Sequence, residues 1–349
     1  MVTDFKRPPR FSPLTRRRLA NFRANKRGFW SLCIFVVVFS LTLMAEFIAN
    51  DKPLVIHYQD EFYFPVVKAY AETEFGGVFE VEADYREYEV QALIEDQGGW
   101  IVWPLIPFSY NTIDYYLPGP APYPPSREHL FGTDNMGKDV TAQLIYGARL
   151  SFLFGIVLTF FSSIIGVCAG GAQGYFGGKF DLIAQRFVEI WAGLPILFIL
   201  IILAGIVESN VYWLLGILVA FSWMALVGVV RVEFLRARNF QYVTAARALG
   251  ASDLRIMVRH VLPNAMVATL TFLPFILTGS ITLLTSLDFL GFGLPSDSPS
   301  LGRLLAQGRT NMHAPWLGLT TFFTLAFMLT LLIFTGEAVR DAFDPRKDV

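Results

Sequence analysis

Six long apolar runs, almost free of charged residues, constrain this chain more than any other feature of its sequence. An α-helix needs about 20 such residues to cross a bilayer. The remaining chain is too short to bury six helices that are apolar on every side. The sequence therefore predicts an all-α polytopic membrane protein with six transmembrane helices. The runs cover residues 29–48, 150–178, 190–207, 209–230, 261–287 and 310–336.

The composition excludes several other classes of protein. Apolar residues make up 54% of the chain, and the formal net charge of −1 argues against a general nucleic-acid binder. Both cysteines lie inside apolar runs, and no two of the four histidines stand at a metal-ligand spacing. The patterns HExxH and GxSxG are missing and no run holds a pair of carboxylates, which argues against a membrane-embedded enzyme.

Basic residues predict which segments face the cytoplasm. Residues 1–28 contain nine Lys and Arg against one acid, and the loop 231–263 contains six arginines. Because loops rich in Lys and Arg stay on the cytoplasmic side, we predict a cytoplasmic N-terminal tail at 1–28 and a first transmembrane helix at 29–48. Six crossings then return the tail at 339–349 to the cytoplasm.

Residues 49–147 separate the first two runs and fall on the outer side in this topology. They contain 16 acids against five Lys and Arg. Residues 54–63 and 77–88 are rich in Val, Ile, Tyr and Phe with partial alternation, which predicts short strands in a small mixed or β-rich insert. Two interpretations stay open: a solvated acidic cap, or a docking surface for a soluble partner.

The segment 132–139 reads GTDNMGKD and differs by one residue from the phosphate-binding pattern GxxxxGK[ST]. Asp139 stands where that pattern needs a hydroxyl for Mg²⁺. No strand-to-helix context surrounds the segment, and the predicted topology puts it away from cytoplasmic ATP. We predict a turn followed by a helix start, and no nucleotide hydrolysis by this chain.

A helical hairpin is predicted between the fourth and fifth runs. The residues from Tyr242 to Leu249 have helical spacing, and Gly250 stands where a left-handed C-terminal cap belongs. Ser252 is typical of an N-cap and predicts a second helix, which ends at Pro263. We refer to residues 242–263 as the hairpin. Its small residues leave room for a partner, although an ordinary amphipathic connector explains the same shape.

The hairpin resembles the EAA loop of ABC-importer permeases, whose pattern is roughly EAAxxxGxxxxxIxxxHxLP. Every spacing matches, and a threonine replaces the glutamate that the family usually has. The matching residues are Thr244, Ala245, Ala246, Gly250, Ile256, His260, Leu262 and Pro263. Segments 18–32, 131–152, 287–294 and 341–346 are similar to the C-type permeases for dipeptides and oligopeptides. The acidic insert is similar to the Yej-type branch, which is associated with oligopeptides and microcin C.

The resemblance implies the fold of an ABC-importer permease, with a permease core at 148–338 that includes the coupling loop 231–263. It implies a multi-pass protein of the bacterial inner (cytoplasmic) membrane with both termini in the cytoplasm. The chain itself would carry no cofactor, because partner ATPase subunits bind ATP and Mg²⁺. The implied partners are a second homologous permease, two ABC ATPase subunits or domains, a periplasmic substrate-binding protein and the lipid bilayer, without nucleic acid.

The resemblance also assigns coupling to the ATPases to ten residues of the hairpin. Arg247 is equally compatible with a solvated basic residue, and His260 with capping of carbonyl groups or contact with lipid headgroups. The ten residues are Thr244, Ala245, Ala246, Arg247, Gly250, Ser252, Asp253, Ile256, His260 and Pro263.

The expected cargo is peptides or peptide-like compounds such as microcin C, with nickel or other small solutes as the alternative. A stand-alone secondary transporter is the main rival. Such carriers usually keep ionisable residues at mid-membrane to couple ions. In this chain Glu46 lies near the end of its run, and the other runs have no acid or base in their cores. The sequence therefore disfavours ion coupling.

Small residues and prolines add two further expectations. Four glycines recur every four residues, a spacing that lets helices approach closely, either within the chain or against a second permease. They are Gly166, Gly170, Gly174 and Gly178. Pro195 and Pro274 interrupt the third and fifth runs, as ordinary kinks or as breaks that line the path.

Overall fold

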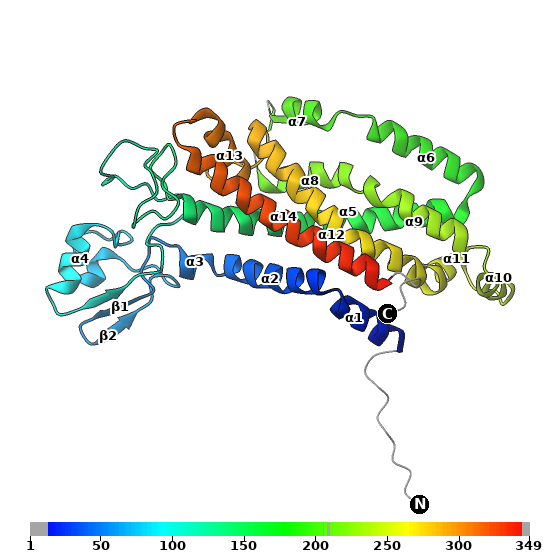
Figure 1. Cartoon of the computed structure of the whole chain (residues 1–349), viewed down its shortest axis with the longest axis horizontal. Coiled ribbons are helices and arrows are strands. Elements are labelled where there is room, and N and C mark those ends of the chain that lie inside the picture. The colour runs from blue at the N-terminus through cyan, green and yellow to red at the C-terminus, as the bar shows by residue number, and fades with distance from the viewer. Residues whose placement is uncertain (1–12, 205, 208–209, 344–349) are drawn as a thin grey trace, which may run out of the picture.

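Long helices run side by side along the longest dimension of the molecule (Figure 1). The computed structural model describes residues 13–204, 206–207 and 210–343. Residues 49–139 lie at one end of the bundle and helix α10 (Gln241–Ala248) at the other (Figure 1). We call these the insert end and the hairpin end. The predicted tails lie partly outside the described residues.

Five helical segments of the described chain are long and apolar enough to cross a membrane. A sixth crossing arises when the bent pair α6 (Gly178–Ala192) and α7 (Ile196–Ala204) is counted as one. The predicted fold class is confirmed. The five segments are α2 (Lys26–Leu43), α5 (Val140–Phe176), α8 with α9 (Val211–Ala237), α11 through α12 (Asp253–Leu290) and α14 (Pro315–Phe343).

The third predicted crossing, 190–207, is broken rather than straight. Helix α6 ends at Ala192 and α7 begins at Ile196, and the chain bends by 61° between the two helices. Pro195 has no amide proton to donate and its ring clashes with the preceding turn, so the helix stops there. Pro274 lies inside the continuous helix α12 (Leu262–Leu290) instead.

Helix α5 lies at the centre of the bundle and packs along α9 (Met224–Ala237) through its glycines. A Cβ atom at Gly170 would lie 2.6 Å from the carbonyl oxygen of Val227. Gly166 and Gly174 face α9 in the same way, whereas a Cβ at Gly178 would meet nothing within 4 Å. The close approach is therefore internal to the chain at three of the four positions.

Several other helices pack around α14. Helices α2 and α12 run along it, and α13 (Leu301–Thr310) lies against it at the insert end (Figure 1). Helix α1 (Pro13–Ala24) contacts α14 as well, and the short α3 (Ala45–Ile48) continues α2 toward the insert. The shared core of α5, α12, α13 and α14 is apolar and almost fully buried.

The insert folds around a three-stranded antiparallel sheet with the strand order β2-β1-β3. A short helix and a 3₁₀ turn pack against one face and bury Ile56, Tyr58, Phe75 and Ile94. The insert is therefore a small mixed unit with its own core. Its elements are β1 (Val55–Tyr58), β2 (Glu61–Tyr63), a 3₁₀ turn (Glu72–Phe75), α4 (Tyr88–Glu95) and β3 (Trp100–Val102).

One of the two predicted strand segments in the insert is wrong. Residues 54–63 form β1 and β2, but 77–88 form no strand: Glu82 makes an isolated bridge with Ala71, and Tyr88 begins α4. The side chains of Val78 and Phe79 are exposed, so the alternation in this segment does not correspond to a buried face. The third strand is β3 instead.

Candidate functional site

The hairpin lies at the end of the bundle, with α10 at the extreme of the molecule (Figure 1). Helix α10 ends in a Schellman motif, because Gly250 N–H donates to the Arg247 carbonyl and Ala251 N–H to the Ala246 carbonyl, at 3.0 and 3.1 Å. Gly250 has φ +81°, a conformation that favours glycine. The predicted glycine cap is confirmed.

The second arm of the hairpin differs from the prediction. Ser252 stands at the N-cap of α11 (Asp253–Ile256) with extended backbone, but its side chain makes no capping hydrogen bond. Pro263 does not end the helix: it lies in the first turn of α12, and the helical chain runs on from Asp253 to Leu290.

A π-helical turn explains how the chain passes through this proline. Met257–Val261 form the turn directly before α12. In a regular α-helix the ring of Pro263 would clash with the carbonyl of Arg259, and the wider π turn removes that clash. The hairpin is therefore continuous with a transmembrane helix, and α11 and α12 are joined without a loop.

The tip of the hairpin presents apolar side chains to the surroundings. Leu249 is 88% exposed and Leu254 is 71% exposed. Apolar side chains that stay exposed at a chain reversal are typical of surfaces that bind a protein partner. A Cβ at Gly250 would meet nothing within 4 Å, so the backbone at the turn is also open to approach.

The structure brings most of the predicted coupling residues to the surface of the hairpin, but not all of them. Thr244, Ala245, Arg247, Gly250, Ser252, Asp253 and Pro263 are exposed, and Ala246 and His260 are half-buried. Ile256 is fully buried and packs with Val243 and Val261, so it holds the two arms together and has no surface to offer. The role of these residues in coupling stays a prediction.

Two of the predicted residues make hydrogen bonds with residues that directly flank the hairpin. The Thr244 hydroxyl, in place of the usual glutamate, donates to the carbonyls of Phe240 and Gln241 at 3.1 and 3.0 Å. The carbonyl of His260 accepts from the Asn264 side chain at 3.2 Å. Thr244 is therefore satisfied by its own helix and leaves its neighbours free for other contacts.

Sequence reasoning missed the residue that connects the hairpin to α5. Tyr175 lies near the end of α5 and is 4% exposed. Its hydroxyl donates to Asp253 Oδ1 at 2.6 Å and accepts from Arg247 Nη2 at 3.1 Å. One signal was present: Tyr175 is the only tyrosine in the apolar run 150–178.

A bidentate ion pair holds α6 against α9 close to this connection. Arg231 Nε and Nη2 donate to the two carboxylate oxygens of Asp181 at 2.5 and 2.6 Å. Two parallel charge-assisted hydrogen bonds fix the relative orientation of both groups. The pair positions the first half of the bent helix pair at the hairpin end.

The insert end is held by a buried polar network around His129. Its Nδ1 lies 2.7 Å from Asp139 Oδ2, its Nε2 lies 3.1 Å from Asp114 Oδ2, and its side chain is 1% exposed. Arg86 completes the network, 4.0 Å from Asp114. Burial alone would lower the pKa of His129, but the hydrogen bonds with Asp139 and Asp114 outweigh it and raise this pKa above 6.5.

The segment that resembles a phosphate loop belongs to this end. The Asp139 carboxylate caps α5 by accepting from Ala142 N–H at 2.7 Å, and Asp134 accepts from Met136 and Lys138 N–H within the turn. Gly132 and Gly137 both have positive φ. The predicted turn and helix start are confirmed, and these carboxylates leave no anion cradle. Among the described residues no cluster of His, Cys, Asp and Glu is arranged to hold a metal ion.

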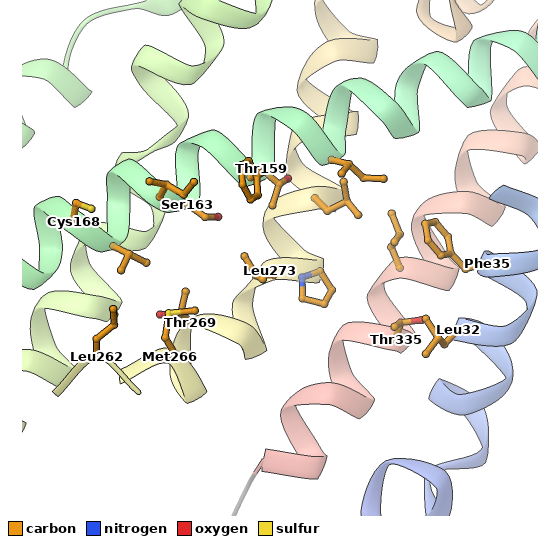
Figure 2. A pocket seen from close by; sticks show the side chains of 17 residues that line it. Leu32, Phe35, Thr159, Ser163, Cys168, Leu262, Met266, Thr269, Leu273 and Thr335 are labelled. Carbon is orange, nitrogen blue, oxygen red and sulfur yellow. The ribbon is translucent and has the colours of Figure 1, made fainter. Parts of the chain in front are cut away.

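A cavity of about 700 Å³ lies between α2, α5, α12 and α14 (Figure 2). Its 17 lining residues include Pro274 and no charged side chain. Thr269 and Thr335 in its wall donate to carbonyls of their own helices. The cavity therefore suits apolar groups and has no carboxylate to bind a coupling ion.

Residues 143–349 match the family model described as binding-protein-dependent transport system inner membrane component. The inner membrane ABC transporter permease protein YejE of Escherichia coli (strain K12) is 57% identical over 340 residues, 97% of this chain and 99% of that protein.

Two further relatives extend this result. The peptidoglycan transport system permease protein YejE of Agrobacterium fabrum is 54% identical and covers 97% of this chain and 95% of its own length. The oligopeptide transport system permease protein OppC of Lactococcus lactis (strain IL1403) is 34% identical over 68% of this chain and 80% of that protein.

These matches, with a bundle of membrane-spanning helices and an exposed hairpin, define a permease subunit of an ABC importer. The chain belongs to the family of binding-protein-dependent transport system inner membrane components. It is accordingly a multi-pass protein of the inner membrane with a transport role, and the family implies ATPase and binding-protein partners.

Proposed function

We propose that this permease forms half of the translocation path of an importer for oligopeptides or peptide-like compounds such as microcin C. A second homologous permease forms the other half, two ABC ATPase subunits bind ATP and Mg²⁺ and hydrolyse the nucleotide, and a substrate-binding protein delivers the cargo. The relatives named for oligopeptide and peptidoglycan transport support this class of cargo. Nickel or another small solute is the alternative.

The observation that carries the proposal is the open tip of the hairpin. Leu249 and Leu254 are exposed, and the turn at Gly250 has free space around it. These features fit insertion of the tip into a groove of an ATPase subunit. Closure of the ATPases around nucleotide then moves the helices that continue from the hairpin, above all α12.

The proposed orientation puts the hairpin end in the cytoplasm. Helix α1 and the end of α14 lie on the same half of the bundle as the hairpin, and the insert lies at the opposite end (Figure 1). Together with the basic N-terminal segment this supports cytoplasmic termini and a periplasmic insert. Reporter fusions at residues 85 and 250 should give signals from opposite sides of the membrane, and signals from the same side would contradict this topology.

A stand-alone secondary transporter fits the molecule less well. Ion-coupled carriers bind their ion with polar or ionisable groups near mid-membrane. The cavity among α2, α5, α12 and α14 has an apolar lining without a carboxylate. Transport by this chain without an ATPase partner would favour that rival.

Gly250→Arg tests the coupling role directly. We expect the variant to insert normally, to lose co-purification with the ATPase subunits, and to abolish uptake, because a long charged side chain would stand at the contact. Gly291→Arg is the matched control. Gly291 also has positive φ and open surroundings, but it follows the last residue of α12, at the end of that helix away from the hairpin. Normal uptake by Gly250→Arg at normal expression would contradict the proposal.

A further inference from the structure

We propose that Tyr175 is the positioning residue that transmits movement of the hairpin to α5. This inference rests on the proposed coupling function of the hairpin and adds the route by which the movement reaches a second transmembrane helix. Helix α12 is continuous with the hairpin, but α5 is separated from it by more than sixty residues of chain, since it ends at Phe176. Helix α5 therefore needs a contact through space.

The Tyr175 hydroxyl makes that contact with both arms of the hairpin at once. It accepts a hydrogen bond from Arg247 on α10 and donates one to Asp253 on α11. Gly250 lies between these two partners, so the hydroxyl bridges the arms at the base of the tip that we assign to the ATPase. Both bonds involve a charged partner, which makes them stronger than hydrogen bonds between neutral groups.

The remaining contacts of Tyr175 connect it both to the bundle and to the hairpin, because its ring shares a buried cluster with Val243 and Ile256 and the Arg247 guanidinium lies 5.7 Å from the ring centroid. Its ring belongs to the buried cluster that contains Phe234 of α9. The Arg238 guanidinium, at the end of α9, donates to the Tyr175 carbonyl at 3.5 Å. Because α5 and α9 approach closely along the glycines, a displacement received at Tyr175 reaches both helices together.

The hydrogen bonds of the Tyr175 hydroxyl suit a contact that must break and re-form as the hairpin moves relative to α5. Arg247 and Asp253 are exposed, so water can hydrate both side chains when the hairpin moves away from Tyr175. A purely apolar contact at the same place would slide without orienting the arms. The hydroxyl instead fixes the direction of the hairpin relative to α5 when both bonds are made.

Tyr175→Phe tests the inference, because it removes the hydroxyl and keeps the buried ring. The experiment uses the full complex of both permeases and ATPases in lipid nanodiscs and proteoliposomes with its binding protein. We expect unchanged co-purification of the ATPases and an unchanged melting temperature. The number of substrate molecules imported per ATP should fall about tenfold, within the range typical of coupling between distant sites.

Tyr242→Phe is the matched control. Tyr242 is a hairpin tyrosine whose hydroxyl accepts a hydrogen bond from Asn264 on α12, and its loss leaves the contact with α5 intact. We expect wild-type uptake per ATP. A double-mutant cycle of Tyr175→Phe with Asp253→Ala should be non-additive in uptake per ATP, because both changes break one hydrogen bond.

Three results would overturn the inference. Wild-type uptake per ATP in Tyr175→Phe would show that the hydroxyl does not transmit movement. Failure of this variant to assemble or to insert would assign the hydroxyl to folding instead. Additive effects in the cycle would show that Tyr175 and Asp253 act separately. Failure of the proposed function itself is recognised separately, because Gly250→Arg would then transport normally while wild-type Tyr175 is in place.

Discussion

The two ends of α5 are held by polar contacts of opposite character. At the insert end, Asp139 is fully buried and caps the helix while it bonds to the buried His129. At the hairpin end, Tyr175 bonds to Asp253 and Arg247, whose side chains are exposed. Water can hydrate the exposed partners of Tyr175 but cannot reach the buried partners of Asp139, so breaking the contact should cost less at the hairpin end than at the insert end.

The charges explain why the insert end is firmly held. Arg86 and the imidazolium form of His129 face Asp114 and Asp139, so two positive groups balance two negative ones, and the side chains of His129, Asp114 and Asp139 are at most 5% exposed. Removal of one partner leaves an uncompensated buried charge. The comparison teaches that the polar contacts of α5 are buried where it meets the insert and have exposed partners where it meets the hairpin, so we expect any tilt of α5 to break the contacts at the hairpin end first.

The largest expected effect is that of His129→Ala on the free energy of unfolding. The variant leaves the carboxylates of Asp114 and Asp139 facing each other without the imidazolium, and we expect a loss of about 3–5 kcal/mol. Denaturant unfolding of the purified protein in nanodiscs measures it. His313→Ala is the control, because His313 is exposed on the loop before α14. Equal losses in the two variants would contradict the anchoring role.

The second expected effect is a pH dependence of the same anchor. The folded-state pKa of His129 is raised above 6.5, so its contribution to stability is complete below pH 6.5 and is lost as the pH rises through the folded-state pKa. Each pH unit by which the folded-state pKa of His129 exceeds its unfolded-state pKa contributes about 1.4 kcal/mol to the free energy of unfolding below pH 6.5. Melting temperatures measured from pH 5 to 9 should fall toward alkaline pH in the wild type. His129→Gln should flatten this part of the profile, and an unchanged slope would remove His129 as its cause.

The contrast between the ends also shows what the sequence was able to predict. The turn at Gly250 depends on neighbouring residues only, and it was predicted with its conformation. The membrane-spanning helices follow from the length of each apolar run. At Pro195 the sequence predicted an interruption but did not distinguish a kink from a break between two helices. The prediction of a strand at 77–88 was wrong, because alternation of apolar and polar residues does not show whether a partner strand exists.

The contacts that hold α5 were not predictable in this way. His129 is ten residues from Asp139 and fifteen from Asp114, and the three side chains meet only because the insert folds back on the helix. Tyr175 is 78 residues from Asp253. Neither set has a fixed spacing, because the intervening segments determine which polar groups are brought together.

The smallest expected effect is that of Asp253→Ala on the free energy of unfolding. Asp139→Ala is the matched variant at the other end of α5. Both aspartates lie at the start of a helix and bond to a side chain of another segment. Asp253 is exposed, so its removal should cost no more than about 1 kcal/mol, whereas loss of the buried Asp139 should cost about 3 kcal/mol or more. Unfolding of both variants under the same conditions measures the difference. Similar losses would show that α5 is held alike at both ends, and the expectation that a tilt breaks the contacts at the hairpin end first would then have no structural basis.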